Sequence, residues 1–328
     1  MNSMDKPYQY LTSDCLDACE LCPRKCGINR ASGMPGVCGA TDKLMVARAA
    51  LHFWEEPPIS GDKGSGAIFF SNCSLKCIFC QNRDISTEGF GLEITPERLV
   101  EIMLELQDQG AHNINLVTAT HYAHVVVPAV KQAQSRGLHI PIVYNTSGYE
   151  RPEIIRELGD IVDVWLPDYK YASQDLAGSL SRVRDYPLVA QQALIAMKES
   201  VDAHGGFLID DDGMLQRGMI VRHLVLPGHV EDSCHVLQNV YNAVGDVPIS
   251  IMNQYTPNND MRKAGGNLSH ALSDEEYEIV LDFADNLGFT QVFWQEGGTV
   301  DESFTPAFDT TGVLESAACQ NEHAASSN

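Results

Sequence analysis

Short apolar strands alternate with helices along the chain from about residue 63, and this alternation limits the folds that the sequence can adopt. Strands are expected at residues 67–71, 113–118, 140–145, 161–166, 219–226, 248–252 and 291–294, and helices at 96–109, 125–136, 152–158, 188–203, 233–244 and 273–287. Apolar runs without a period of two are typical of strands that helices cover. The pattern predicts an α/β fold with a partial or complete parallel (β/α) barrel, or alternatively a doubly wound open sheet.

Local signals mark the ends of several of these elements. Residues 95–97, Thr-Pro-Glu, supply an N-cap, a first-turn proline and a first-turn acid, and Gly110 ends the helix that they open. Residues 273–276, Ser-Asp-Glu-Glu, have the spacing of a capping box. No glycine-rich phosphate turn follows the first strand, which favours the barrel over the open sheet.

Polar side chains follow almost every expected strand. In chain order these are Thr118, Thr120 and His121, then Asn145 and Ser147, Asp168 and Lys170, Arg222 and His223, Asn253 and Gln254, and finally Gln295 and Glu296. Each one singly could be a structural ion pair or a hydrogen-bonded core histidine. The C-terminal ends of barrel strands meet on one face, however, so the whole set predicts a binding site there.

A cysteine-rich loop follows the first expected strand. Cys73, Cys77 and Cys80 have the spacing C-x3-C-x2-C, so one loop can turn three sulfurs toward one point, and the aromatic Phe79 precedes the third cysteine. Three thiolates are one ligand short of a closed zinc site or a four-iron cluster. The loop therefore predicts a metal centre with one position open to a substrate or cofactor.

A second group of cysteines lies in residues 1–62, which form a Cys-rich N-terminal extension. Cys19, Cys22, Cys26 and Cys38 could make a four-ligand site for zinc or, as the second choice, an iron–sulfur cluster; a metal-free segment is the alternative. Cys15, Cys19 and Cys22 repeat the spacing of the later loop. No strand precedes this earlier triple, and Leu21 replaces the aromatic residue, so the later triple is the expected cluster loop.

Composition excludes some classes of function. A net charge of −22 argues against sequence-independent binding to nucleic acid or to an anionic membrane. Ten cysteines in a chain without a signal-peptide pattern favour metal or redox chemistry over disulfides, and no apolar run approaches the length of about 18 residues of a membrane span. We expect a cytoplasmic protein with a core at residues 63–300 and a polar, disordered tail at 301–328.

Four segments together resemble one family. Residues 73–82, 144–149, 167–170 and 221–228 are similar to the radical S-adenosylmethionine (SAM) core of the pyruvate formate-lyase activating enzyme group. Uncharacterised iron–sulfur relatives of that activase share the Cys-Pro-Arg-x-Cys segment near the N-terminus and the segments at residues 54–61 and 110–118. The resemblance extends over roughly residues 19 to 295.

The resemblance implies a [4Fe-4S] cluster on Cys73, Cys77 and Cys80, whose fourth iron is chelated by the amino and carboxylate groups of SAM. A flavodoxin- or ferredoxin-like partner would supply an electron. Reductive cleavage of SAM would then give methionine and a 5′-deoxyadenosyl radical, which abstracts hydrogen from a substrate.

The resemblance also implies the residues that contact SAM. Lys170 and Arg222 can neutralise its carboxylate. Asn145 and Ser147 can bond the ribose hydroxyls, and Phe79 can lie near the adenine. Asp168 is also expected among the residues that bind the cofactor. The family's Gly-Gly-Glu motif, which receives the SAM amino group, is absent. Residues 116–121, Leu-Val-Thr-Ala-Thr-His, stand in its place, so Thr118, Thr120 or backbone carbonyls are expected to serve instead.

Three functions remain open, and no side chain is assigned a catalytic role. The first is a radical SAM oxidoreductase that installs a glycyl radical in a partner protein. The second uses the same chemistry on a metabolite or peptide. The third is a non-catalytic iron–sulfur or zinc redox protein that uses both cysteine groups, which would have no need of polar strand ends.

Overall fold

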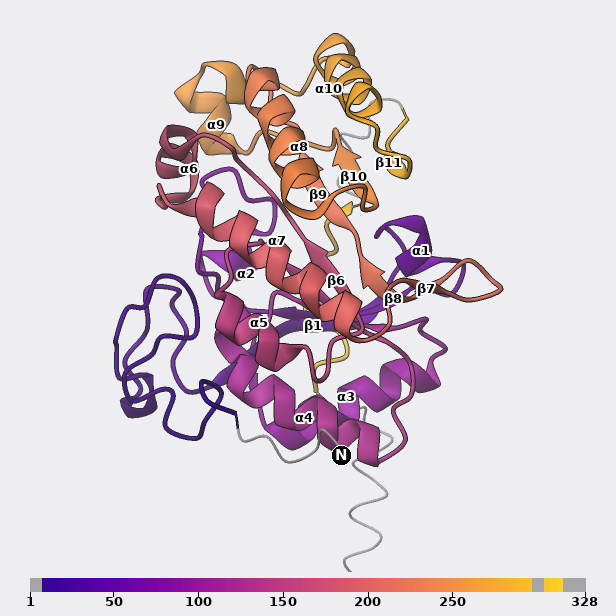
Figure 1. The fold of residues 1–328 in the computed structure, drawn as a ribbon. Helices are drawn as coiled ribbons and strands as arrows, with labels where there is room; N and C mark the ends of the chain where they lie inside the picture. The colour runs from indigo at the N-terminus through magenta and orange to yellow at the C-terminus, as the bar shows by residue number, and fades with distance from the viewer. Residues whose placement is uncertain (1–7, 297–303, 315–328) are drawn as a thin grey trace, which may run out of the picture.

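The computed structural model describes residues 8–296 and 304–314, and two sheets form its centre. The larger sheet has the strand order β3-β1-β2-β4-β5-β6-β8-β7, and the smaller has the order β11-β10-β9 (Figure 1). The strands are β1 (Leu44–His52), β2 (Ser65–Phe70), β3 (Leu92–Ile94), β4 (Ile114–Val117), β5 (Ile142–Thr146), β6 (Val164–Pro167), β7 (Leu208–Ile209), β8 (Leu215–Met219), β9 (Val221–Leu224), β10 (Ile249–Met252) and β11 (Val292–Trp294).

The two sheets are joined where β8 passes into β9. Only Ile220 separates these strands, and a parallel bridge between Asp168 and Arg222 connects the end of β6 to β9. The strands β2, β4, β5, β6, β9, β10 and β11 therefore all run in the same direction. This arrangement confirms the predicted α/β fold with a parallel (β/α) barrel. The barrel is partial, because among the described residues β11 pairs with β10 alone.

Helices cover the outer side of the curved sheet. The longer ones are α3 (Pro96–Asp108), α4 (Ala123–Ser135), α5 (Pro152–Leu158), α7 (Tyr186–Ala203), α8 (Val230–Val244) and α10 (Asp274–Leu287). Figure 1 shows α5 and α7 in front of the sheet and α8 and α10 at the upper end. The predicted cap and capping box are present at Thr95 and Ser273. No helix in the described ranges is long and apolar enough to cross a membrane.

The strand β1 was not predicted. It pairs antiparallel with β2, from Val46 opposite Phe70 to His52 opposite Ser65, so residues 44–52 belong to the core sheet although the sequence placed them with the N-terminal extension. The strand contains three alanines, and alanine favours helices. Pairing with β2 therefore decides its conformation. The sequence also gave no signal for the short α1 (Pro57–Ser60), α2 (Arg83–Ser86), α6 (Gln174–Ser181) and α9 (Asn259–Ala264).

The segment 304–314 corrects the prediction of a disordered tail at 301–328. Its backbone bonds β1, because the amide of Thr310 donates to the Ala47 carbonyl (3.0 Å) and the amide of Ala49 donates to the Thr311 carbonyl (2.9 Å). Val313 is fully buried, and Arg98 of α3 donates to its carbonyl (3.1 Å). These contacts use mainly backbone groups, which hydrophobic patterning does not report. Residues 301–303 and 315–328 lie outside the described part of the chain.

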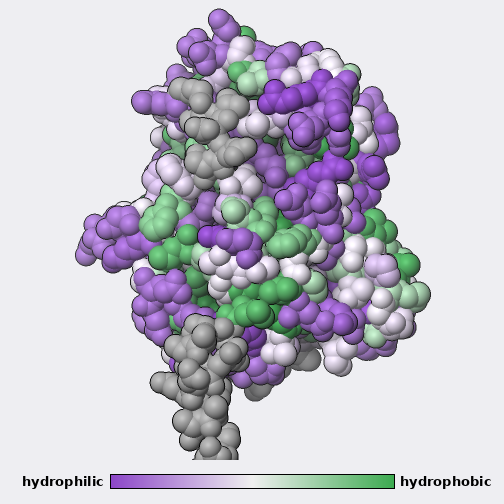
Figure 2. All heavy atoms as spheres, turned by 180° about the vertical axis from the view of Figure 1, so that it is seen from behind, coloured by the Kyte–Doolittle hydropathy of each residue, from purple (hydrophilic) through white to green (hydrophobic). Residues whose placement is uncertain are grey.

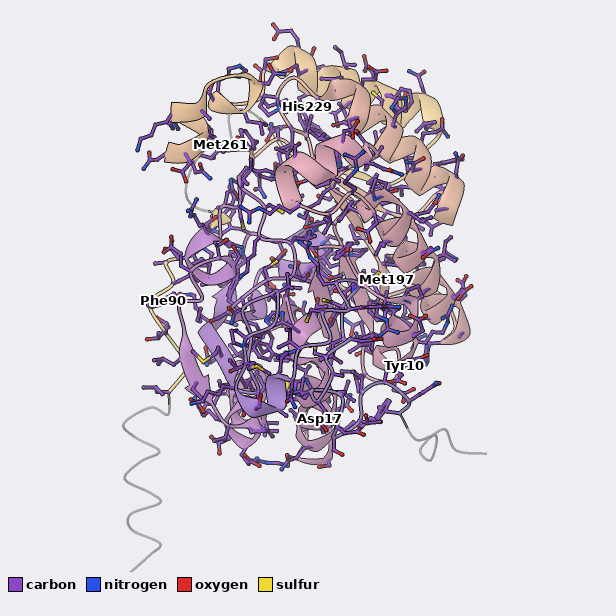
Figure 3. All side chains as sticks on the ribbon, turned by 90° about the vertical axis from the view of Figure 1, so that its left-hand side faces the viewer. Tyr10, Asp17, Phe90, Met197, His229 and Met261 are labelled. Atoms are coloured by element: carbon purple, nitrogen blue, oxygen red, sulfur yellow. The ribbon has the colours of Figure 1, made fainter. Side chains whose placement is uncertain are left out.

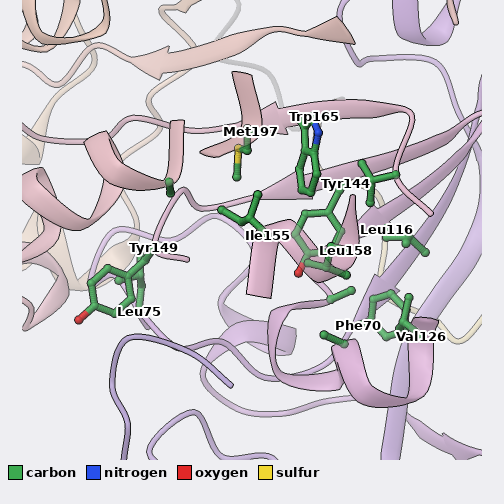
Figure 4. Packing of buried hydrophobic residues seen from close by; sticks show 14 of the residues in the cluster. Phe70, Leu75, Leu116, Val126, Tyr144, Tyr149, Ile155, Leu158, Trp165 and Met197 are labelled. Atoms are coloured by element: carbon green, nitrogen blue, oxygen red, sulfur yellow. The ribbon is translucent and has the colours of Figure 1, made fainter. Parts of the chain in front are cut away.

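Apolar side chains fill the space between the sheet and its helices (Figure 4). The figure labels Phe70, Leu116, Tyr144 and Trp165 on successive strands and Val126, Ile155, Leu158 and Met197 on helices; all are at most 1% exposed. The rings of Tyr144 and Trp165 lie 5.7 Å apart. Neighbouring residues such as Val117 and Asn145 line a cavity inside the curve of the sheet.

Hydrophobic side chains also gather on the surface, in the middle of the molecular face seen in Figure 2.

The N-terminal segment at residues 8–43 is mostly loop, with one short 3-10 helix at Arg30–Ser32. Its start is fixed by the Glu157 carboxylate of α5, which accepts hydrogen bonds from the amides of residues 9, 10 and 11. The fully buried Arg30 donates to the carbonyls of Thr41 and His121. In Figure 3, Tyr10 and Asp17 mark this segment at the end of the molecule away from His229 and Met261.

Candidate active site

A cavity of about 390 Å³ lies at the C-terminal ends of the parallel strands. This volume falls within the range of ordinary small-molecule sites. Apart from Thr120, the residues that the sequence predicted for the cluster and cofactor all line this cavity: Cys73, Cys77, Phe79, Cys80, Thr118, Asn145, Ser147, Asp168, Lys170 and Arg222. These side chains come from five different strand ends, so the barrel brings together residues that are up to about 150 positions apart.

Each sulfur of the cluster loop accepts a hydrogen bond. The Ser181 hydroxyl donates to Cys77 Sγ (2.9 Å), the Ser86 hydroxyl donates to Cys80 Sγ (3.3 Å), and the amide of Leu75 donates to Cys73 Sγ (3.4 Å). Donors of this kind orient metal ligands and stabilise negative charge on sulfur. The loop is therefore equipped for thiolate ligands.

Burial favours the protonated form of two free thiols of the loop, those of Cys77 and Cys80. It raises the pKa of Cys77 and raises that of Cys80 to about 12, while the nearby Lys170 ammonium opposes the rise at Cys77. Metal binding to such thiols displaces their protons. Within residues 8–296 and 304–314 no group of three or more Cys, His, Asp or Glu side chains has the geometry of a metal site.

A buried ion network lies beside this loop. The Asp168 carboxylate binds Lys170 Nζ at 2.5 Å and the Arg222 guanidinium at 2.9 Å. Burial acts to raise the pKa of Asp168, but Lys170 and Arg222 together hold that pKa below its usual range. Asp168 is therefore ionised and holds both cations in place.

Arg222 has further partners deeper in the cavity. Its guanidinium donates to Glu55 Oε2 (3.0 Å) and to Asn145 Oδ1 (2.5 Å), and the Asn145 amide donates in turn to Glu55 Oε1 (3.2 Å). The family resemblance implied that both Lys170 and Arg222 can neutralise the SAM carboxylate. In the structure Arg222 joins three acceptors into one network, whereas the described residues offer Lys170 Nζ a single acceptor, Asp168.

The two histidines at strand ends are core residues. His121 is 2% exposed and pairs with the Ser71 carbonyl (2.8 Å); His223 is also 2% exposed and pairs with Tyr169 and Ser233. Neither lines the cavity. Thr120 also lies outside it and donates to Glu150 (2.5 Å), so of the two threonines considered for the SAM amino group only Thr118 is in the site.

Comparison with known proteins agrees with this arrangement. Residues 67–187 match the family model of the radical SAM superfamily. The chain carries a radical SAM domain. A domain of this superfamily implies a [4Fe-4S] cluster, SAM and oxidoreductase chemistry, and the matched range contains the cluster loop together with Asn145, Ser147, Asp168 and Lys170.

Two individual proteins are similar to this chain. The uncharacterised protein MJ0674 of Methanocaldococcus jannaschii is 27% identical over 289 residues, which cover 84% of this chain and 76% of the relative. Among solved structures, methylornithine synthase (PylB) is similar with a TM-score of 0.46 and 15% identity over 73% of this chain. The chain spans 63% of the length of that synthase.

The cavity of the radical SAM domain fits SAM in its polar lining. The Ser147 hydroxyl is buried and has no hydrogen-bond partner among the described residues, although it lines the cavity. A buried hydroxyl without a partner is costly, and a ribose hydroxyl would supply one. Phe79 is 7% exposed and lies 6.0 Å from the Tyr255 ring, which gives an apolar wall for the adenine. The residues present therefore match the expected cofactor.

Sequence reasoning missed two acidic residues of the site. Glu55 and Glu56 enter the cavity from the loop after β1, and burial raises the pKa of both. Glu55 accepts hydrogen bonds from Asn115, Asn145 and Arg222. A signal was present, because two adjacent acids interrupt an apolar stretch at residues 51–59. Their place in the site depends on β1, which was not predicted.

The N-terminal cysteines lie near one another but form no described metal site. Cys19, Cys22 and Cys38 are buried, Cys26 is half-buried, and all four are free thiols. Burial raises the pKa of Cys38, and Cys19 and Cys26 raise it further, which places these thiols in one neighbourhood. The Arg30 guanidinium lies 3.5 Å from Cys19 Sγ.

Proposed function

We propose that this radical SAM enzyme cleaves SAM reductively and abstracts hydrogen from a second substrate, with a glycyl-radical protein as the first candidate target. The observation that carries the proposal is a single cavity. It joins three cysteines, each with a hydrogen-bond donor on its sulfur, to the Asp168 ion network and to the unpartnered Ser147 hydroxyl. A non-catalytic electron carrier would leave this convergence of polar strand ends without a purpose.

The cluster, when bound, would pass one electron to SAM, break one carbon–sulfur bond to give methionine, and leave a 5′-deoxyadenosyl radical that takes up a hydrogen atom. The protein's own residues would bind and orient the cluster and SAM. Cys73, Cys77 and Cys80 would hold three irons. Lys170, which bonds Asp168 and lies near Cys77, would face the SAM carboxylate. Asn145 and Ser147 would bond the ribose.

The direct test is anaerobic reconstitution with iron and sulfide, followed by incubation with SAM and dithionite. We expect a cluster absorbance and the formation of 5′-deoxyadenosine by the wild type. The triple variant Cys73→Ala, Cys77→Ala, Cys80→Ala is the matched control and should give neither. A full cluster without 5′-deoxyadenosine would refute the proposal.

Two partners belong to the proposal. The electron donor would be a flavodoxin- or ferredoxin-like protein. The glycyl-radical target rests on the likeness of residues 73–82, 144–149, 167–170 and 221–228 to the activase group. Activation would appear as a glycyl radical signal in electron paramagnetic resonance of a candidate partner. Deuterium transfer from a labelled metabolite or peptide into 5′-deoxyadenosine would identify the alternative class of target.

A second metal is also part of the proposal, at Cys19, Cys22, Cys26 and Cys38. Buried free thiols in a segment with almost no regular secondary structure support it, because small segments of this kind are commonly stabilised by metal. The triple cysteine variant of the cluster loop should retain zinc or iron in this case. Absence of both metals from that variant would contradict a second site.

A further inference from the structure

Glu56 differs from the other charged groups of the cavity, because no cation within the described residues forms a direct ion pair with it, although the Arg222 guanidinium is near enough to oppose the rise of its pKa. Its side chain lines the cavity and is 7% exposed. One carboxylate oxygen, Oε2, is buried and has no hydrogen-bond partner in the described part of the chain. A buried polar atom without a partner costs free energy that a ligand could recover.

The charges of the cavity do not balance. Three carboxylates, those of Glu55, Glu56 and Asp168, face two cations, Lys170 and Arg222. Asp168 binds both cations, and Arg222 also binds Glu55. The carboxylates therefore outnumber the cations by one, and Glu56 is the one without a direct ion pair in the described part of the chain. A buried carboxylate in excess is neutralised either by a proton or by a cation that enters the cavity.

The walls of the cavity also suit a cation. They include the aromatic side chains Phe53, Trp54, Phe69, Phe79, Phe293, Trp294 and Phe304. Trp54 and Trp294 are 56% and 55% exposed, so their rings are open to solvent, and Trp54 packs edge-on against Phe304 at 5.5 Å. Aromatic faces attract ammonium and guanidinium groups. The net charge of −22 adds a long-range attraction, which raises the concentration of cations near the protein.

We propose that the hydrogen-donating substrate carries a cationic nitrogen, an ammonium or guanidinium group, which the Glu56 carboxylate receives inside the cavity. This assignment rests on the proposed function, because it names the class of molecule that the radical would attack. SAM has an ammonium group of its own. SAM is expected at the cluster loop, however, where Lys170 is near enough to Cys77 to oppose the rise of its pKa. Glu55 instead pairs with Arg222, and Glu56 is close to the same guanidinium.

The test uses simple amines as probes of the full-length reconstituted protein. Pentylammonium, pentylguanidinium and the neutral pentan-1-ol are titrated by calorimetry into the wild type, Glu56→Gln and Glu278→Gln. Glu278 is an exposed residue of α10, so its variant controls for the loss of one charge. The neutral glutamine at 56 keeps the shape of glutamate, and thermal unfolding confirms that this variant folds. Glu56→Asp, which keeps the charge, should retain part of the effect.

We expect both cations to bind the wild type and Glu278→Gln about tenfold more tightly than pentan-1-ol, as a charge-assisted hydrogen bond would give. Glu56→Gln should lose this preference and keep its affinity for SAM. Equal binding of the three probes to the wild type, or an unchanged preference in Glu56→Gln, would overturn the inference. Loss of SAM affinity in Glu56→Gln would also overturn it, because the ammonium would then be that of SAM.

Production of 5′-deoxyadenosine by the wild type is measured in parallel. A cation preference that depends on Glu56, without any 5′-deoxyadenosine, would contradict the proposed function alone. Formation of 5′-deoxyadenosine without a cation preference would contradict the inference about the substrate alone.

Discussion

The Nε of Arg24 donates a hydrogen bond to the carbonyl of Ser74 at 3.0 Å, and this bond ties the N-terminal segment to the cluster loop. The same guanidinium also donates to the carbonyls of Ser181 and Arg182. Ser181 in turn donates to Cys77 Sγ. Arg24 therefore holds the cluster loop and the residue that bonds one of its sulfurs. It belongs to the Cys-Pro-Arg-x-Cys segment, which gives that segment a structural role beside the cluster.

Replacing Arg24 by alanine should loosen the cluster loop. We expect the reconstituted Arg24→Ala protein to lose iron to a chelator about tenfold faster than the wild type, since residues that orient metal ligands commonly affect affinity by this factor. Arg156→Ala is the matched control, because Arg156 is 59% exposed and contacts only Glu199 among the described ion pairs. Equal rates of iron loss in the wild type and Arg24→Ala would show that the contact does not support the loop.

The segment 304–314 should contribute to stability through Val313. This side chain is fully buried, whereas the next residue, Leu314, is 61% exposed. We expect Val313→Ala to lower the free energy of unfolding by about 1–2 kcal/mol, as for other buried methyl groups, and Leu314→Ala to change it by less than about 0.5 kcal/mol. Chemical denaturation of both variants measures the difference. Similar values for the two would mean that the segment is not packed on β1 in solution.

The parallel strands and the cluster loop could be predicted from sequence because their signals are local. Apolar runs, N-caps and cysteine spacing each lie within a few residues, and Cys73, Cys77 and Cys80 share one loop. β1, Glu55 and Glu56 could not be placed in this way. Their positions depend on antiparallel pairing with β2 and on contacts with Asn145 and Arg222, which are 90 and 167 residues from Glu55.

The hydrogen bonds of Arg222 also depend on residues that are distant in the sequence. Residue type and strand position predicted that it lies in the site, and it does. They did not predict that Asp168, Glu55 and Asn145 would already occupy its guanidinium. Chemical type predicts what a side chain can bind, whereas the three-dimensional neighbours decide what it does bind.

Glu150 should make stability depend on pH. It is fully buried and accepts hydrogen bonds from Thr120 and Thr146, and burial raises its pKa from 4.5 to about 7. The folded protein therefore binds this proton more tightly than the unfolded chain. The stabilisation is complete below pH 4.5 and is lost as the pH rises through 7.

The Glu150→Gln variant isolates this effect, because glutamine does not titrate. Between pH 4.5 and pH 8 we expect the variant to gain about 3 kcal/mol of unfolding free energy relative to the wild type, from the difference between the two pKa values. Urea denaturation at several pH values measures it, with Glu278→Gln as an exposed control. A constant difference between Glu150→Gln and the wild type across this range would contradict the raised pKa.

Asp168 should be the most sensitive member of the ion network. Asp168→Asn removes the negative charge between Lys170 and Arg222 without changing the size of the side chain, and leaves two partly buried cations with Glu55 as their only described carboxylate partner. We expect a loss of about 3 kcal/mol in unfolding free energy, which is the usual cost of breaking a buried ion pair from one side. Asp175→Asn is the matched control, since Asp175 is 83% exposed and pairs with Arg184 at the surface. A loss below about 0.5 kcal/mol for Asp168→Asn, the value typical of exposed pairs, would show that water screens the network. Lys170 and Arg222 would then be free to bind SAM directly, as the sequence first predicted.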